Sequence, residues 1–448
     1  MRELTKSAIG YAWAMSLFGA EQFANAFSPR GSERAGEAFY TVTRAATDEL
    51  GDILWAAYQV GDQLQRSSVN LLFDFATLRA FNPTYASRLA EEFARQLAET
   101  LRSLAPGESL SLAYQEFRNN YEVYNLVKHV HDRLHIPSGG DFPLAELLER
   151  AYALGAYPDL WAVEGLGHDY AASLMDRGAP VRDILTDERA SVLPAKSLTM
   201  MHAGIGLAFA ERLMKRVTPY SSREHARGVL AEFLALCREN SRHGYVGAAY
   251  ESLGLVTRTW HAQTVALVDS VLCEIAPEAV GYFWHGAGRA LYFLPIYFVP
   301  GLLSPWAAAE REPPREEARL NMKAGLAWAT TLVNIRQPRI MENLLRRDGA
   351  TLARDAGFTN GLMSSLIMGY DVTPGDEFIE AFCAFRSDAR DAASAERWER
   401  MVASPCREAL QDVYPALREH ERLGEVFHYQ DLPALAVRLR QTRAAVPR

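Results

Sequence analysis

Histidine is the side chain best suited to proton transfer near neutral pH, and three of the eleven histidines in this sequence lie close to glycines that recur along the chain. His168, His202 and His285 are each within three positions of a glycine in a run of small and apolar residues. A neutral imidazole can act as a base, an acid or a metal ligand. If helices that carry these glycines line one inner surface, we expect the three imidazoles to converge there.

Two of these histidines have a charged neighbour at helical spacing. Glu164 precedes His168 by four residues and Arg289 follows His285 by four, so each pair shares a helix face. A carboxylate that orients His168 and a guanidinium that binds anions would suit a thioester, a carboxylate or a developing oxyanion. The sequence therefore predicts a catalytic set of Glu164, His168, His202, His285 and Arg289. The alternative interpretation is that these are polar groups satisfied at helix interfaces.

The glycines beside these residues belong to a longer series. A glycine flanked by small and apolar residues recurs six times, at intervals of 36 to 43 residues. This period suits a repeat of two helices, stacked into a solenoid or a closed helical ring. The series consists of Gly165, Gly204, Gly247, Gly286, Gly325 and Gly361.

A repeated glycine inside helices needs a compensating cause, since glycine costs a helix about 1 kcal/mol relative to alanine. The simplest cause is close packing of helix axes across small side chains. The other cause is room for a ligand. Because aromatic residues crowd the same region from Trp161 to Phe298, a tunnel for an extended polyene is one interpretation and an ordinary packed core is the other.

Helical spacing of apolar residues dominates the chain, and strict alternation is hard to find over more than four residues. We therefore expect an all-α fold. Between the glycine-bearing segments lie amphipathic segments with few glycines, so that each unit is predicted to be an αα-hairpin. These segments are Arg223–Glu239, Thr259–Ile275 and Pro338–Arg347.

The strongest linker is the run from Pro137 to Pro143, which combines prolines with two glycines. We place a domain boundary there. The prediction is an N-terminal helical domain over 1–136, a helical-repeat domain over 144–370 and a C-terminal helical cap over 371–448. Helices are expected at Tyr85–Ser103 and from Leu110 to about His135.

The same glycine motifs resemble an uncharacterised bacterial protein family encoded in enediyne polyketide biosynthesis clusters. That family has, in order, a Glu-Gly pair, a Val-Gly-Ile-Gly-Trp-Ala segment, a Gly-Tyr-Gly-Phe-His segment and a Gly-Ile-Gly-Arg-aromatic segment. Here the corresponding places hold Glu164-Gly165, residues 203–208, residues 244–247 and residues 286–293. The resemblance covers about residues 145–382.

The resemblance implies a part in building or modifying a long unsaturated polyketide or a similar apolar metabolite. It supplies neither a reaction nor catalytic residues. The sequence also departs from the family, because Arg242-His243 stand where the family has an acidic residue and no histidine directly follows Gly247.

Charge and cysteine content narrow the function classes further. A formal net charge of −8 argues against nucleic acid as the main partner. The four cysteines form no CxxC pair, which is typical of a reduced cytoplasmic protein.

The run Met1–Ala20 imitates a secretion signal, but Glu3 and the large Phe18 argue against one. Residues 290–305 are too short for a membrane span, and a peripheral membrane contact there is one interpretation.

The sequence contains no complete metal-binding or nucleotide-binding motif of a familiar kind. His131 and His135 have the spacing of a zinc pair but no acid in the right place, and the GxG steps lack a preceding strand and a third glycine. Any cofactor therefore stays unknown, and no metal is assigned.

Two functions remain in view from the sequence. The first is an accessory or tailoring protein that binds an apolar polyene-type substrate in a cavity bordered by the predicted catalytic set. The second is a non-catalytic helical scaffold that binds partner biosynthetic enzymes. For the first function, His285→Ala and Arg289→Ala are expected to abolish activity with little change in melting.

Overall fold

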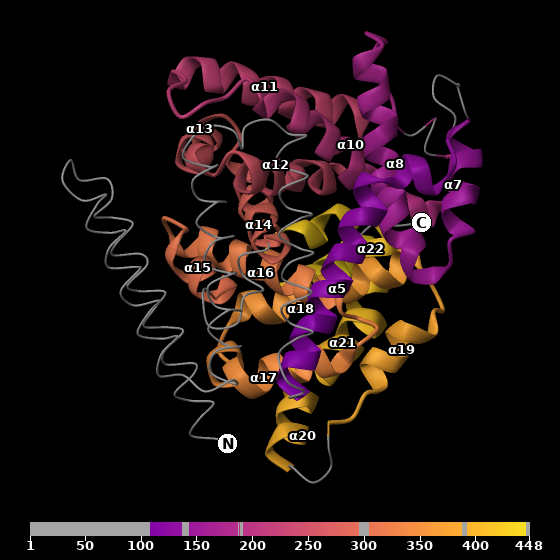
Figure 1. Ribbon diagram of the computed structural model, residues 1–448, viewed down its shortest axis with the longest axis vertical. Helices are drawn as coiled ribbons and strands as arrows, with labels where there is room; N and C mark the ends of the chain where they lie inside the picture. Colours follow the sequence, from indigo (N-terminus) through magenta and orange to yellow (C-terminus); the bar gives the residue numbers. More distant parts are fainter. Residues whose placement is uncertain are drawn as a thin grey trace, which may run out of the picture. The chain divides into compact units, whose positions relative to one another are not determined.

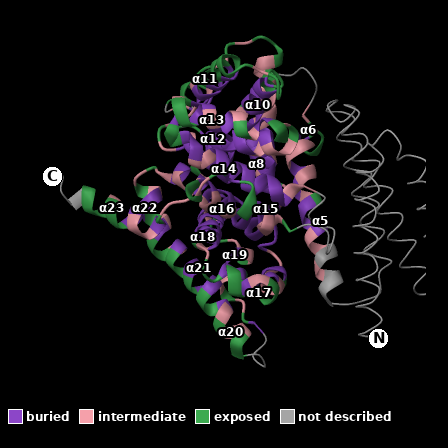
Figure 2. Cartoon of the chain, turned by 90° about the vertical axis from the view of Figure 1, so that its left-hand side faces the viewer, coloured by how far each residue is buried: buried purple, intermediate pink, exposed green. Residues whose placement is uncertain are grey.

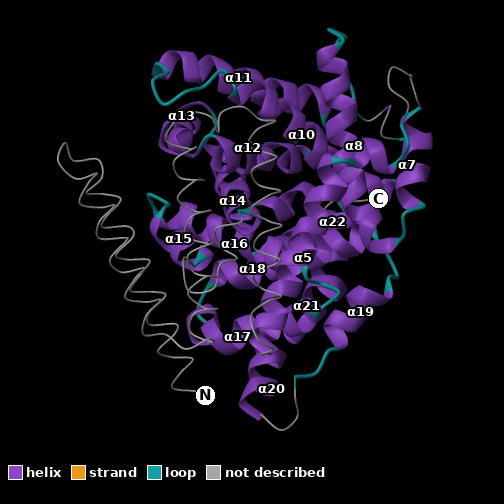
Figure 3. Cartoon of the chain, viewed as in Figure 1, coloured by secondary structure: helices purple, strands orange, loops and turns teal. Residues whose placement is uncertain are grey.

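The computed structural model describes residues 108–136, 143–186, 188, 191–294, 304–387 and 392–444. The expectation of an all-α fold is confirmed. Within these residues all regular secondary structure is helical, apart from one isolated β-bridge between Leu185 and Ser241 (Figure 3). No helix among them is long and apolar enough to cross a membrane.

The described residues from Gln115 onward form one compact unit. Several expectations fall outside the described residues: residues 1–107 of the predicted N-terminal domain, the helix Tyr85–Ser103, the signal-like start, most of the linker, and residues 295–303 of the apolar stretch. The expected helix from Leu110 is present as α5 (Glu108–Lys128) and α6 (Val130–Arg133). From Gln115 onward α5 belongs to the same unit as the repeat helices.

The six glycines of the series lie in six helices that pack one against the next in chain order (Figure 1). Each helix is buried along much of its length, which explains why apolar and small residues surround each glycine. The helices are α8 (Ala156–Asp176), α10 (Leu198–Met214), α12 (Val246–Trp260), α14 (Pro277–Phe293), α16 (Glu316–Val333) and α18 (Ala356–Val372).

Glycine is required at these helix crossings because backbone meets backbone. A Cβ atom built on Gly204 would lie 2.1 Å from the carbonyl oxygen of Glu164, and one on Gly286 would lie 2.0 Å from that of Glu251. Gly325 approaches the carbonyl oxygen of His285 in the same way, at 1.8 Å. The prediction of close helix packing is confirmed at these crossings. At Gly247 the crowding atoms belong instead to the Tyr282 ring and to the backbone of a C-terminal segment.

Other helices connect the glycine-bearing ones along the chain, and α11 in particular exposes one face (Figure 2). One boundary differs from the prediction Thr259–Ile275. The chain turns through η3 (Ala262–Thr264) after Trp260, because His261 leaves the helical conformation at φ −132° and ψ 36°. The connecting helices are α11 (Arg223–Asn240), α13 (Val265–Ile275), α15 (Pro305–Arg311) and α17 (Pro338–Leu352).

A glycine and a proline mark the ends of two of the glycine-bearing helices. Helix α8 ends at Asp176 with Gly178 at φ +63°, and α14 begins at Pro277. Helix α7 (Leu144–Tyr152) leads into α8, and η2 (Ala195–Ser197) leads into α10.

The C-terminal part begins with α19 (Glu377–Ala384) and continues as nearly unbroken helix from Ala392 to Glu419. Two π-helical turns interrupt that helix, η5 (Glu399–Ala403) and η6 (Ala409–Val413). They separate α20 (Ala392–Trp398), α21 (Ser404–Glu408) and α22 (Tyr414–Glu419), and Pro405 and Pro415 stand at the starts of the last two. The chain closes with η7 (Leu423–Phe427) and α23 (Leu432–Ala444).

Candidate functional site

Four ionisable side chains from three helices meet in the core. Arg289 on α14 donates to Glu164 on α8 (Nη2 to Oε1, 2.6 Å) and to Glu251 on α12 (Nη1 to Oε2, 3.1 Å). His285 lies one turn before Arg289, with its Nδ1 3.2 Å from Oε1 of Glu251. None of the four residues is more than 2% exposed. We call Glu164, Glu251, His285 and Arg289 the core cluster.

The glycine crossings explain how the core cluster assembles. Glu164 and His285 each stand one residue before a repeat glycine, and Glu251 offers its carbonyl oxygen to the Gly286 crossing. Because these helix backbones are in contact, side chains beside the crossings reach one another directly. Only small residues at the crossings allow three helices to bring charged groups so close together.

The charge of Arg289 is already engaged by two carboxylates. Burial lowers the pKa of the guanidinium, and the charges of Glu164 and Glu251 outweigh burial and raise it above its ordinary value. The guanidinium carbon also lies 4.6 Å from the centre of the Trp328 ring, a cation–π contact. Two carboxylates thus face one guanidinium. Arg289 therefore forms ion pairs with Glu164 and Glu251 and is not free to bind an anionic ligand.

His285 is held as a neutral imidazole. Burial lowers its pKa, the hydrogen bond to Glu251 raises it, and Arg289 lowers it further, with a net lowering. Since the carboxylate of Glu251 accepts a hydrogen bond, the proton is assigned to Nδ1 and the lone pair to Nε2. An imidazole oriented in this way presents Nε2 as a base.

The core cluster leaves three polar atoms without a hydrogen-bond partner among the described residues. They are Oε2 of Glu164, Nε2 of His285 and Nε of Arg289. Buried polar atoms are nearly always paired with protein or with water. Unpartnered acceptors and a donor in one cluster therefore indicate a place for water or for a polar group of a ligand.

Aromatic side chains surround the core cluster. The His285 ring centre lies 6.4 Å from the Trp328 ring and 6.3 Å from the Phe427 ring. Trp161 packs edge-on against Trp328 at 6.3 Å. The indole nitrogens of Trp161 and Trp328 also lack partners among the described residues. The surroundings of the core cluster are therefore mainly aromatic.

His202, the second predicted site residue, lies elsewhere and has a partner on each ring nitrogen. Its Nδ1–H donates to the carbonyl oxygen of Leu198 at 2.6 Å, and its Nε2 accepts from the backbone N–H of Arg242 at 3.0 Å. The ring stacks on Tyr245 at 5.1 Å. Burial lowers the pKa of His202 to about 4. This geometry matches the alternative interpretation of a satisfied core histidine.

His168 also lies outside the core cluster, although Glu164 is on the same helix. Its ring nitrogens contact Asp169 at 3.1 Å and Glu211 of α10 at 3.2 Å, and Glu211 pairs with Lys128 of α5. Burial lowers the pKa of His168, but the hydrogen bonds to both carboxylates raise it to a net higher value. His168 therefore belongs to a partly buried ionic cluster that joins α5, α8 and α10.

Glu251 is the member of the core cluster that the sequence analysis missed. It follows Gly247 by four residues and is the one acidic residue of α12. A single carboxylate inside an otherwise uncharged, fully buried stretch is a signal that points to a buried charged partner. That signal was present in the sequence.

Metal ligation has no geometric support within the described part of the chain. No group of three or more histidine, cysteine, aspartate or glutamate side chains there is arranged to hold an ion. His131 and His135 lie at the end of the α6 region.

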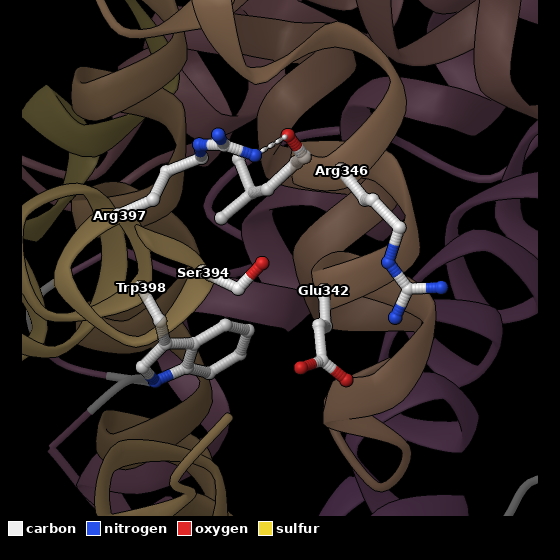
Figure 4. A pocket seen from close by; sticks show the side chains of 6 residues that line it. Glu342, Arg346, Ser394, Arg397 and Trp398 are labelled. Carbon is white, nitrogen blue, oxygen red and sulfur yellow. Dashed lines mark hydrogen bonds between the residues drawn. The ribbon is translucent and has the colours of Figure 1, made fainter. Parts of the chain in front are cut away.

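A surface pocket lies far along the chain from the core cluster, between α17 and α20 (Figure 4). Glu342, Leu345 and Arg346 face Ser394, Arg397 and Trp398 across it. Arg397 closes it partly by donating to the carbonyl oxygen of Leu345 at 3.1 Å. Its free space fits about one water molecule, whereas small-molecule sites commonly enclose about 300 Å³ or more. We therefore take the core cluster as the candidate site.

Comparison with known protein families, with curated proteins and with solved structures gives no match to this chain.

Proposed function

We propose that this protein is a cytoplasmic accessory or tailoring protein in the biosynthesis of an apolar metabolite of the polyene or polyketide type. The core cluster is its site, and proton transfer at Nε2 of His285 is its chemistry. The substrate class rests on the resemblance of the glycine motifs to the enediyne-cluster family. The location rests on the spacing of the cysteines.

One observation carries the chemical part of the proposal. His285 is neutral, its Nδ1 is oriented by Glu251, and its Nε2 has no partner among the described residues. A carboxylate that orients an imidazole is the usual way to prepare a general base. Aromatic surroundings favour a substrate that is apolar near the reacting atom.

Arg289 is a positioning residue in this proposal. Its bond to Glu251 keeps that carboxylate in place for His285, and its bond to Glu164 ties the site to α8. An anionic substrate would meet two carboxylates, so a neutral polyene chain or a neutral ester fits better than a free acid. This differs from the sequence-based expectation of an anion clamp.

The experiment compares a producer strain carrying wild-type protein with one carrying His285→Asn. Asparagine keeps a donor toward Glu251 and removes the Nε2 base. We expect metabolite production to fall at least about 100-fold while the protein still folds, since general bases typically contribute about 10² to 10⁴ in rate. The matched control is His202→Gln, which changes a buried histidine outside the core cluster and is expected to retain production per folded molecule. Full production by His285→Asn would contradict the proposal.

A scaffold that binds partner enzymes is the second candidate. The close backbone packing at the glycine crossings favours it, because it makes a rigid array. A solvent extract of the protein from its producer, analysed by absorption and mass spectrometry, separates the two functions. A bound polyene supports the first function. Partner enzymes that copurify equally with wild type and His285→Asn, without an extractable ligand, support the second.

A further inference from the structure

Two of the four cysteines meet in the C-terminal part of the chain. Cys383 lies in the last turn of α19, and Cys406 lies in α21, 23 positions later. The thiol of Cys406 donates a hydrogen bond to the sulfur of Cys383. Both helices pack on α18. The rings of Phe382 and Phe385 hold the end of α19 against Trp398, at 5.8 and 4.7 Å between ring centres. The fold therefore keeps the two sulfur atoms as neighbours.

The two thiols differ in exposure and in acidity. Cys406 is fully buried, whereas Cys383 is half-buried. The hydrogen bond from Cys406 lowers the pKa of Cys383, burial raises it and the charge of Arg407 lowers it, with a net lowering. The same hydrogen bond and burial raise the pKa of Cys406 well above its ordinary value. Cys383 is therefore the thiol that ionises more readily and that solvent reaches, while Cys406 keeps its proton.

Exposure alone does not single out Cys383. Cys273 is more exposed, but partial desolvation and the charge of Asp269 raise its pKa in spite of Arg315. Cys237 is fully buried, and burial raises its pKa. The thiolate is the reactive form of cysteine, and cysteines that react with oxidants combine a lowered pKa, access to solvent and a second thiol nearby. Of the four cysteines, Cys383 is the one that combines these properties.

We propose that Cys383 and Cys406 are a site of reversible oxidation, at which a peroxide converts the two thiols into a disulfide between α19 and α21. The Cys383 thiolate attacks one peroxide oxygen, so that an S–O bond forms and the O–O bond breaks. The second oxygen leaves and takes a proton from solvent, as water or an alcohol. The Cys406 sulfur then attacks the Cys383 sulfur, the S–O bond breaks, and the hydroxyl leaves as water with the Cys406 proton. The two thiols together lose two electrons, and the peroxide gains them.

The disulfide would fasten the end of α19 to α21 by a covalent bond. In a cytoplasmic protein such a bond is transient, because cellular thiols reduce it again. The core cluster lies on α8, α12 and α14, so the cysteine pair is separate from it and goes beyond the proposed function.

The first test adds a stoichiometric amount of hydrogen peroxide to the reduced wild-type protein and blocks the remaining thiols with N-ethylmaleimide before digestion and mass spectrometry. A linked pair of peptides that contain Cys383 and Cys406 is expected to be the main oxidised product. It should form at least about tenfold faster than any oxidation of Cys273 and disappear with dithiothreitol. Earlier oxidation of Cys273, or oxidation of Cys383 without a link to Cys406, would overturn the proposal.

The second test uses Cys406→Ser. Serine keeps a hydrogen-bond donor toward Cys383 and cannot form the disulfide, so dimedone is expected to capture the sulfenic acid of Cys383 at least about tenfold more than in wild type. The matched control is Cys273→Ser, which removes an exposed cysteine outside the pair and should behave as wild type. Equal capture in Cys406→Ser and in wild type would overturn the role of Cys406. The first test uses the wild-type chain and does not require this variant to fold.

Discussion

Arg289 and Glu164 are 125 positions apart in the chain, and their side chains meet at 2.6 Å in the core. The contact joins α8 to α14, although α10 and α12 lie between them in chain order. Glu251 of α12 accepts from the other terminal nitrogen of the guanidinium. The successive helices therefore wrap so that the first and fourth of the array share a charged centre.

This arrangement predicts that Arg289→Met destabilises the protein strongly. Removal of the guanidinium leaves two buried carboxylates without their cation, and breaking a buried pair in this way typically costs about 3–5 kcal/mol. The free energy of unfolding in urea measures the loss. The control is Arg212→Met, whose exposed partner Asp176 makes an ion pair that contributes at most about 1 kcal/mol. Similar small losses in both variants would show that Arg289 is not held as described.

The structure thereby changes the expectation for Arg289→Ala. A side chain read from sequence as a free anion clamp should be removable with little change in melting. Arg289 instead has two buried carboxylate partners, and neither carboxylate has another cation nearby in the core cluster. We therefore expect Arg289→Ala to lower the melting temperature. For this reason His285→Asn, which keeps a donor to Glu251, is the better variant for the functional test.

The glycine crossings yield a prediction with an internal control. Gly286→Ala places a methyl group 2.0 Å from the carbonyl oxygen of Glu251, so the helices must separate, at a cost of about 1–3 kcal/mol. Gly228→Ala in α11 meets no atom within 4 Å and is expected to stabilise the helix by about 0.5–1 kcal/mol. Thermal unfolding of both variants checks the signs. If both variants changed thermal stability in the same direction, Gly286 would not be required for close helix packing.

Much of the fold could be predicted from sequence because its signals are local. Helix periodicity, the prolines at helix starts and the repeated glycines depend on residues within a few positions of one another. The glycine series also indicated close packing correctly, since glycine in a buried helix has few other causes. The spacing alone did not show which helices meet beyond immediate neighbours.

The candidate site was predicted only in part, for a geometric reason. His168 and Arg289 each stand three residues after a repeat glycine, yet only Arg289 reaches the core cluster. The corresponding face of α8 lies against α5 and α10, where Glu211 binds His168. The equivalent repeat position thus has different surroundings in different helices. Because such surroundings depend on distant elements, the local pattern could not separate these residues.

His202 predicts a pH dependence of stability. Its folded pKa of about 4 lies below its ordinary value of 6.5, so the unfolded state binds the proton more tightly. The stabilising contribution of neutral His202 is therefore complete above pH 6.5 and is lost as the pH falls toward 4. The loss amounts to about 3 kcal/mol at full protonation. Unfolding free energies of wild type and His202→Gln between pH 4 and pH 7 isolate this term, and a difference that does not vary with pH would contradict it.

Asp371 predicts the opposite slope in an overlapping pH range. This carboxyl on α18 accepts hydrogen bonds from Thr199 of α10 at 3.0 Å and from Arg418 of α22 at 2.8 Å. Burial raises its pKa to about 6, although Arg418 lowers it. The folded state thus binds the proton more tightly than the unfolded state. Stability from this group is complete below about pH 4 and is lost as the pH rises through 6.

Asp371→Asn removes the titration while keeping a side chain of the same shape. The unfolding free energy of wild type relative to this variant is expected to fall by about 3 kcal/mol from pH 4 to pH 7, because two pKa units correspond to that free energy. Asp176→Asn, an exposed aspartate that pairs with Arg212, serves as the control and should show at most about 1 kcal/mol. A relative stability that rises with pH would mean that Arg418 dominates over burial, and that Asp371 is held as an ordinary ionised partner between α10, α18 and α22.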